Sequence, residues 1–282
     1  MIAAVEATAV NAAHAVGAVV AVEQGDIGVL GLAASGILVA VAVGVSLWRQ
    51  LGLERSLLWA SARALVQLLI VGWALQLVVD PDDRLIWSVL WIVAMVGFAA
   101  WTTSRRAADV PHVLALSLLA YATAALVTLG VLFGFGIYDV EGRTLVPLAG
   151  MVVGNSLAAT VLVSRQLLIA ATEQRDLIEA RLALGLTSTE AFRPHLRRSL
   201  RTALVPQIET TKAVGIVFLP GAMVGLILAG VDPADAVKVQ VSVMYLVLGS
   251  VATTTAVMSL GISRELFTSA QQLRRIGGSA ER

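Results

Sequence analysis

Residues 206–230 read PQIETTKAVGIVFLPGAMVGLILAG, an apolar stretch long enough to cross a lipid bilayer. No charge occurs from Ala213 to Gly230, yet the stretch begins with Glu209 and Lys212 and has Pro220-Gly221 in its middle. Length and composition predict a transmembrane helix, whereas Pro220 predicts a weak point because proline has no N–H to donate. Broken helices are tolerated at membrane depth where they line a cavity.

The composition of the whole chain favours a membrane protein. Of 282 residues, 58% are hydrophobic and only 14% are charged, with a mean hydropathy of +0.85. Soluble domains carry about 25% charged residues. A soluble core cannot hide this much apolar surface, so the bilayer is the expected solvent. The chain has no cysteine, which excludes disulfides, zinc thiolate sites and iron–sulfur ligation.

Hydropathy predicts an all-α polytopic membrane protein with about seven transmembrane helices. Residues 1–26 are apolar and rich in alanine but lack the basic start of a secretory signal, so we expect an interfacial segment. A further span or a cleaved segment over residues 1–22 stays open. The permease-like domain is 27–262 and the tail is 263–282. The predicted spans are 27–48, 57–79, 85–103, 113–136, 145–168, 205–230 and 236–261.

The loops predict the orientation of the chain. Fifteen arginines lie on one side, seven of them between the fifth and sixth spans, and the opposite loops are acidic. The positive-inside rule then places the N-terminus outside and the C-terminus in the cytoplasm. The external acids are either cation collectors or ordinary loop residues: Asp80, Asp82, Asp83, Asp139, Glu141, Asp232 and Asp235.

The loop at 169–204 is the longest and has a helical pattern. Gly185 fits a helix C′ position, and Thr187 or Ser188 fits an N-cap with Glu190 behind it. This predicts a helix, a glycine turn and a second helix, which Pro194 bends or restarts. Residues 179–185, EARLALG, with Glu179, Ala180 and Gly185, resemble the EAA loop with which ABC-transporter permeases contact their ATPase. A solvated basic loop is the plain alternative.

The chain itself has no phosphate-binding loop. Neither of its two lysines, Lys212 and Lys238, follows a glycine, so no G-x-x-x-x-G-K-[ST] stretch exists. If ATP drives this protein, a separate P-loop ATPase subunit binds the ATP and Mg²⁺, and this chain binds no cofactor.

Polar residues inside predicted spans are costly and therefore candidates for function. Arg63 and Gln67 lie four residues apart in the second span, where an interhelical hydrogen bond is the structural alternative. Glu209 and Lys212 lie three apart and can pair on one helical face. This pair is either a structural clasp or part of the inner gate of a permeation path.

Two proline-containing segments are similar to each other. Residues 147–155 (PLAGMVVGN) and 220–225 (PGAMVG) both place methionine and small residues after proline. They either pack helices closely or line a substrate route, where Met151 and Met223 offer thioethers and Asn155 offers an amide oxygen. The scattered histidines, His14, His112 and His195, form no convincing cluster, so the metal ligands are unknown.

Four stretches together resemble the FetB-type iron-export ABC transporter permease family. The family's acid-x-x-Lys pair matches Glu209 and Lys212, its Leu-Pro-Gly-x-Met run matches 219–223, and its Gly-Met-x-x-Gly-Asn run matches 150–155. The resemblance covers the second to the seventh predicted span. The four stretches are 52–72, 146–155, 179–192 and 197–240.

The resemblance implies a multi-pass permease in the bacterial inner membrane that works with a separate ATPase and exports iron. It is also similar to plant aluminium-tolerance membrane proteins, so the cargo is a metal cation of open identity. A chain without internal duplication predicts a homodimer around a shared route; no nucleic-acid partner is expected. In this interpretation Glu209 and Lys212 anchor the sixth span, and Pro220-Gly221 lets loop motion reshape the cavity.

Three alternatives stay open on the residues. The first is an ABC permease for an anion or organic solute, and the second is a proton-driven secondary transporter, which needs neither an ATPase nor the long basic loop. The third, an intramembrane enzyme, has no support from an H-E-x-x-H stretch or from clustered acids inside the spans.

Overall fold

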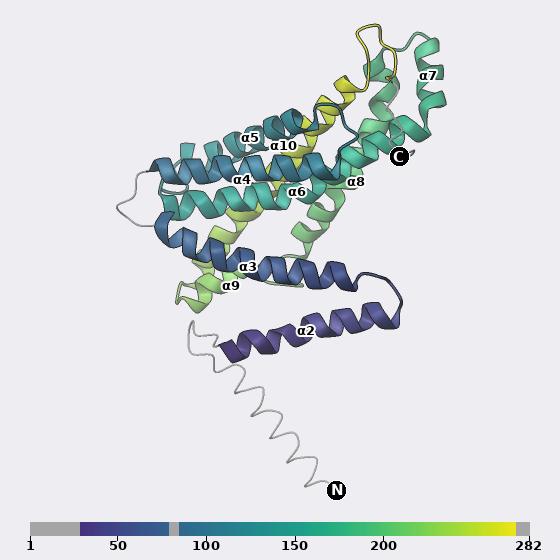
Figure 1. The fold of residues 1–282 in the computed structure, drawn as a ribbon. Helices are drawn as coiled ribbons and strands as arrows, with labels where there is room; N and C mark the ends of the chain where they lie inside the picture. Colours follow the sequence, from purple (N-terminus) through teal and green to yellow (C-terminus); the bar gives the residue numbers. More distant parts are fainter. Residues whose placement is uncertain (1–28, 79–84, 275–282) are drawn as a thin grey trace. The chain divides into compact units, whose positions relative to one another are not determined.

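The computed structural model describes residues 29–78 and 85–274, and within them it contains nine helices and no strand beyond isolated bridges. The predicted all-α class is thus confirmed for the described residues. The segment 1–26 and His14 lie outside them. The chain divides into two compact units, Met1–Leu77 and Val78–Arg282, which are taken separately below (Figure 1).

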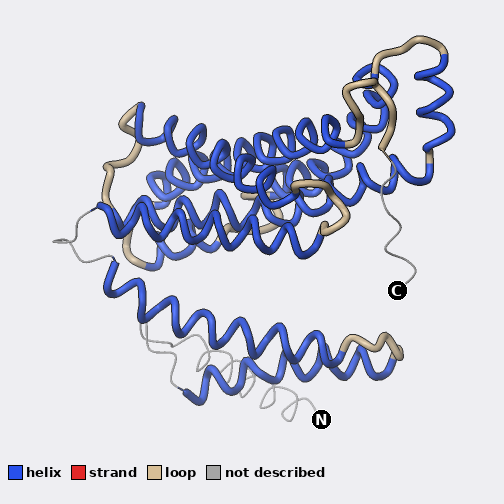
Figure 2. The backbone as a smooth tube through the Cα atoms, turned by 45° about the horizontal axis from the view of Figure 1, so that its top comes forward, coloured by secondary structure: helices blue, strands red, loops and turns tan. Residues whose placement is uncertain are grey.

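The described part of the first unit contains two helices, α2 (Val29–Trp48) and α3 (Glu54–Val78), joined by a short loop. They run antiparallel to each other (Figure 2). Ser46 organises the loop: its buried hydroxyl donates to Glu54 Oε1 at 2.7 Å and accepts from the amide of Leu53 at 3.2 Å. Large apolar side chains such as Leu38 and Leu68 are exposed, as in helices that face lipid.

The second unit is a bundle of four long helices that lie side by side (Figures 1 and 2). They are α4 (Leu85–Arg106), α5 (Val113–Gly134), α6 (Gly142–Glu173) and α10 (Pro233–Glu265). Both α10 and α4 pack against α5 and α6. Small buried residues allow this close packing: Ala100, Ala120, Ala124 and Ala149 are each fully buried.

Most buried hydroxyl groups in this bundle are satisfied by protein acceptors. Thr160 donates to the carbonyl of Ser156, and Thr254 donates to that of Ser250, each at 2.7 Å within its own helix. Between helices, Thr103 and Tyr121 share a hydrogen bond of 2.9 Å. Intrahelical bonds of this kind let serine and threonine occupy an apolar environment at low cost, because the hydroxyl donor is paired within its own helix.

The predicted sixth span, 205–230, is wrong as a single helix. It is divided between α8 (Ser188–Ala213) and the short α9 (Gly221–Leu228). Gly215 adopts a φ of +85°, which a regular helix excludes, and Pro220 becomes the N-cap of α9. The missing N–H of Pro220 and the left-handed glycine together explain why the helix stops at Ala213.

The other predicted spans coincide with helices, and five of these are long and apolar enough to cross a membrane. The described apolar part of α2 is shorter, at Ala34–Trp48. The total of about seven spans and the orientation therefore stay predictions. The five are Glu54–Trp73, Leu85–Arg106, Val113–Gly134, Gly142–Glu173 and Pro233–Glu265.

Candidate coupling elbow and translocation segment

The long basic loop is almost entirely helical. After α6 ends at Glu173, α7 (Arg175–Ala183) turns away from the bundle, and α8 returns toward it (Figure 1). We call residues 175–201 the elbow. The predicted pattern of helix, glycine turn and helix is confirmed. Pro194 lies within α8, so the predicted restart of the helix there is wrong, whereas a bend at this proline stays a prediction.

The turn of the elbow is fixed by its sequence. Gly185 has a φ of +89°, and its amide donates to the carbonyl of Leu182 at 2.9 Å, which closes α7. Thr187 then caps α8: its hydroxyl accepts from the amide of Glu190 at 3.3 Å, and the Glu190 carboxylate accepts from the amide of Thr187 at 3.0 Å. This capping box holds the two helices at a defined angle. The hydrogen bonds from Thr187 lower the pKa of Glu190.

The other predicted coupling residues lie on α7. Glu179 is exposed and forms an ion pair of 2.6 Å with Arg175, and Ala180 is also exposed. Ile178, by contrast, is fully buried and anchors α7 in the cluster that contains Phe192. One face of α7 is therefore fixed to the protein, and the face with Glu179 and Ala180 is open.

His195 lies inside the elbow, as the sequence suggested, rather than in a metal site. It is buried, its ring packs beside Phe192, and its Nε2 lies 3.4 Å from a guanidinium nitrogen of Arg181. Burial lowers the pKa of His195, and the charges of Arg181 and Arg198 lower it further. The imidazole is therefore neutral at pH 7.

The second part of the candidate site, the translocation segment, is the end of α8 together with the break. Lys212 Nζ and Glu209 Oε1 are 2.9 Å apart, so the predicted pair is confirmed, and both side chains are exposed. The chain then passes through Val214–Pro220 without helix, and the amide of Gly215 donates to the carbonyl of Phe218 at 2.9 Å. A polar pair thus stands directly before a non-helical segment.

The two methionine segments lie on helices that share a neighbour. Met223, on α9, and Met151, on α6, are each half-buried, and both helices pack against α10. Asn155 is exposed and donates to the carbonyl of Met151 at 2.8 Å, which leaves its amide oxygen available. Helices α6 and α9 are not among the closely packed pairs, so a direct juxtaposition across a route stays a prediction.

The remaining candidates do not form a metal centre. Arg63 and Gln67 lie one turn apart on α3 in the first unit, and both are exposed. His112 pairs with Glu265 at 3.2 Å. Across residues 29–78 and 85–274, no group of three His, Asp or Glu side chains is placed to hold a metal ion.

Sequence reasoning missed the segment that follows α10. Residues 266–274 fold back as a hairpin against the elbow, and Arg175 donates to the carbonyls of Leu273 and Arg274 at 3.0 and 3.2 Å. The signal for this hairpin is weak but present: Leu266, Phe267 and Leu273 are large apolar residues in a mostly polar tail, and all three are buried.

Comparisons with known proteins place the chain in a family. The model of the uncharacterised protein family UPF0014 matches residues 29–267. The membrane protein STAR2 of Oryza sativa subsp. japonica is 37% identical over 88% of this chain and 86% of its own length. The "Probable iron export permease protein FetB" of Escherichia coli K12 is 34% identical, over 86% and 93% respectively.

A third relative, "Protein ALUMINUM SENSITIVE 3" of Arabidopsis thaliana, is 32% identical over 86% of this chain and 88% of its own length. No solved structure matches the chain. The apolar helices and these relatives agree on a multi-pass membrane protein. The chain therefore belongs to the UPF0014 family of membrane proteins, and it is related to both the bacterial iron-export permease and the plant aluminium-sensitivity proteins.

Proposed function

We propose that the chain is the membrane-spanning permease subunit of an ABC transporter that exports iron or a related metal cation. The observation that carries the proposal is the elbow. It is a short exposed helix, closed by Gly185 and joined through a capping box to α8, which continues to the Glu209–Lys212 pair. An ATPase-driven permease needs such a rigid connection between its surface and its route.

Helix α8 is long enough to transmit motion from the elbow to the break. Its 26 residues span roughly 39 Å at 1.5 Å per residue. The capping box holds one end, and the other end stops at the Val214–Pro220 break. A helix transmits displacement along its axis, whereas a non-helical segment changes its dihedral angles easily. Motion of the elbow would therefore reshape the break.

The chemistry beside the break suits a metal cation. Pro220 cannot donate to the carbonyl of Ile216, so helical pairing is lost there, and free carbonyls can coordinate a cation. In the proposed arrangement α6 and α9 face each other across the route, where Asn155 would add an amide oxygen, and Met151 and Met223 would add thioethers for a softer ion. The printed name of the Escherichia coli relative supports iron as the cargo and export as the direction.

The assembly that follows is a homodimer with two ATPase subunits, which hold the ATP and Mg²⁺. Its location would be the bacterial cytoplasmic membrane, with the elbow and the C-terminus on the cytoplasmic side. A symmetric pair of permease chains is the simplest way to close a shared route.

Two measurements test this proposal together. The first is co-purification of the chain with a P-loop ATPase from the same cells, and the second is the iron content of cells that lack the chain. We expect a stable complex and raised cellular iron. A stable complex with unchanged metal content would mean another solute, and a chain that transports without any ATPase would mean a secondary transporter.

A further inference from the structure

The residues after α10 form a defined element, the C-terminal hairpin, residues 266–274. Its turn is closed by two backbone bonds: the amide of Thr268 donates to the carbonyl of Gln272 at 2.9 Å, and the amide of Arg274 donates to that of Leu266 at 2.8 Å. Gln271 adopts a φ of +60° to make the reversal.

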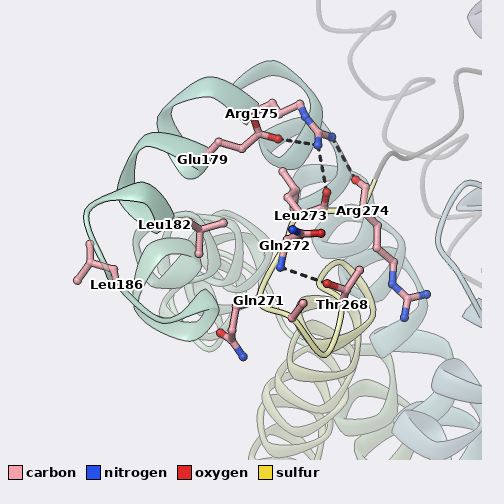
Figure 3. A pocket seen from close by; sticks show the side chains of 10 residues that line it. Arg175, Glu179, Leu182, Leu186, Thr268, Gln271, Gln272, Leu273 and Arg274 are labelled. Carbon is pink, nitrogen blue, oxygen red and sulfur yellow. Dashed lines mark hydrogen bonds and ion pairs between the residues drawn. The ribbon is translucent and has the colours of Figure 1, made fainter.

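This hairpin is fixed to the elbow at three places. Arg175 bridges Glu179 of α7 and two hairpin carbonyls, as Figure 3 shows. The Gln271 side-chain oxygen accepts from the amide of Ser188 at 2.6 Å. The ring of Phe267 packs edge-on against Phe192, with centroids 5.8 Å apart. The elbow and the hairpin therefore form one block.

An open hollow of about 790 Å³ lies between α7 and the hairpin (Figure 3). Its α7 side carries Glu179, Leu182 and Leu186, and its hairpin side carries Ala270 and Gln272 among others. At the adjacent turn Leu184 is 83% exposed. Leu177 and Leu186 are exposed as well, so large apolar side chains cluster beside the hollow at an end predicted to face water, and such a cluster marks a protein–protein docking surface.

Charge identifies the kind of partner. The elbow and the hairpin together carry seven arginines against three carboxylates, and five of these arginines are exposed. A complementary partner presents an acidic rim around an apolar pocket. Of the exposed five, Arg274 lines the hollow, and the other four lie on α8, beside α7: Arg193, Arg197, Arg198 and Arg201.

We propose that α7 and the C-terminal hairpin form one composite docking surface for the ATPase subunit. The ATPase inserts a segment into the hollow, receives Leu184 and Leu186 in an apolar pocket, and pairs its acidic rim with the arginines. This inference rests on the proposed function. Its consequence is that the ATPase contacts α10 through the hairpin as well as α6 and α8 through the elbow, so that the C-terminal ends of the two longest helices, α6 and α10, are driven together.

The absence of cysteine makes a direct test simple, because any cysteine introduced is the only one in the chain. Ala183→Cys marks exposed α7, Ala270→Cys marks the hairpin side of the hollow, and Val140→Cys marks the exposed α5–α6 connection as a matched control. Each variant is labelled with a hydrophilic maleimide, with and without purified ATPase. At ATPase concentrations about ten times Kd, roughly nine in ten sites are occupied, so a covered cysteine labels about tenfold more slowly.

A charge substitution gives a second readout. Arg274→Glu reverses an exposed charge, while the hairpin bonds of this residue use only its backbone. We expect weaker ATPase binding with a slower association rate, and affinity that falls as ionic strength rises. Arg274→Lys keeps the charge and should bind like the unmodified chain.

The outcomes separate this inference from the proposed function. Protection of both Ala183→Cys and Ala270→Cys, with Val140→Cys unprotected, supports the composite surface. Protection of Ala183→Cys alone, together with normal binding by Arg274→Glu, would overturn the composite surface and leave the ABC assignment intact. An unmodified chain that binds no ATPase would overturn both.

Discussion

Replacing Arg175 with alanine should release the C-terminal hairpin from α7 without unfolding the bundle. The guanidinium group of Arg175 donates to the carbonyls of Leu273 and Arg274 and pairs with Glu179. No other described side chain holds those two carbonyls. The hairpin would keep its packing through Phe267 but lose its polar attachment to α7.

The free energy lost in Arg175→Ala depends on how exposed the side chains of Arg175 and Glu179 are. Hydrogen bonds from a charged donor contribute about 1.5–3 kcal/mol when buried. The Arg175 side chain is 32% exposed, so water replaces part of this contribution. The exposed ion pair with Glu179 contributes only about 0.5 kcal/mol. We expect a loss of about 2 kcal/mol for the attachment, which is a factor of roughly 30 at 1.4 kcal/mol per tenfold.

Hydrogen exchange followed by mass spectrometry measures this loss as local opening. The amides of Thr268 and Arg274, which close the hairpin, should exchange roughly 30-fold faster in Arg175→Ala, while peptides from α6 stay unchanged. Glu179→Gln is the control: it removes the ion pair alone and should accelerate exchange only about twofold. Equal exchange in the unmodified chain and Arg175→Ala would refute the claim that this side chain fixes the hairpin.

Three further predictions concern pH, the cap and the route. The folded state lowers the pKa of His195 below 6.5, so the unfolded state binds the proton more readily and stability is lost as pH falls below that value. In His195→Gln, Tm should therefore change less between about pH 7.5 and about pH 5.5 than in the unmodified chain. Thr187→Ala removes the capping box and should destabilise the elbow by about 1 kcal/mol, measured by hydrogen exchange of α8's first turn. Pro220→Ala and Glu209→Gln should each reduce metal-stimulated ATP hydrolysis by the reconstituted transporter several-fold, because one stiffens the break and the other frees the end of α8.

Each of these has an outcome that contradicts it. A Tm that falls equally with pH in His195→Gln would assign the pH dependence to other groups. Unchanged exchange in Thr187→Ala would mean that the other contacts of the elbow, such as the packing of Phe192 and Ile178, hold it without the cap. If both Pro220→Ala and Glu209→Gln left transport and coupled ATP hydrolysis intact, the break would not be the moving part of the route.

The elbow could be predicted from the sequence because its signals are local. Gly185 after an amphipathic run, and Thr187 three residues before Glu190, determine the turn through bonds within a few residues. The Glu209–Lys212 pair was equally predictable, since a spacing of three places both side chains on one helical face. Their roles in coupling and transport stay predictions.

The break and the hairpin were harder to predict from the sequence, for opposite reasons. Hydropathy averages over about 19 residues, so it merged the end of α8, the break and α9 into one span, although Gly215 and Pro220 lie within it. The hairpin depends on long-range contacts, such as Arg175 with Leu273, that no local pattern reveals. A short polar segment after the last span therefore appeared to be only a tail.

The most direct test of the central claim uses liposomes that contain the chain and its ATPase, with the ATPase on the outer face. Fe²⁺ and ATP are added outside, and metal in the lumen is measured against time. The account predicts ATP-dependent accumulation of Fe²⁺ in the lumen, away from the ATPase side, and none with the chain alone. Vigorous ATP hydrolysis without metal movement, or movement toward the ATPase side, would contradict iron export by this protein.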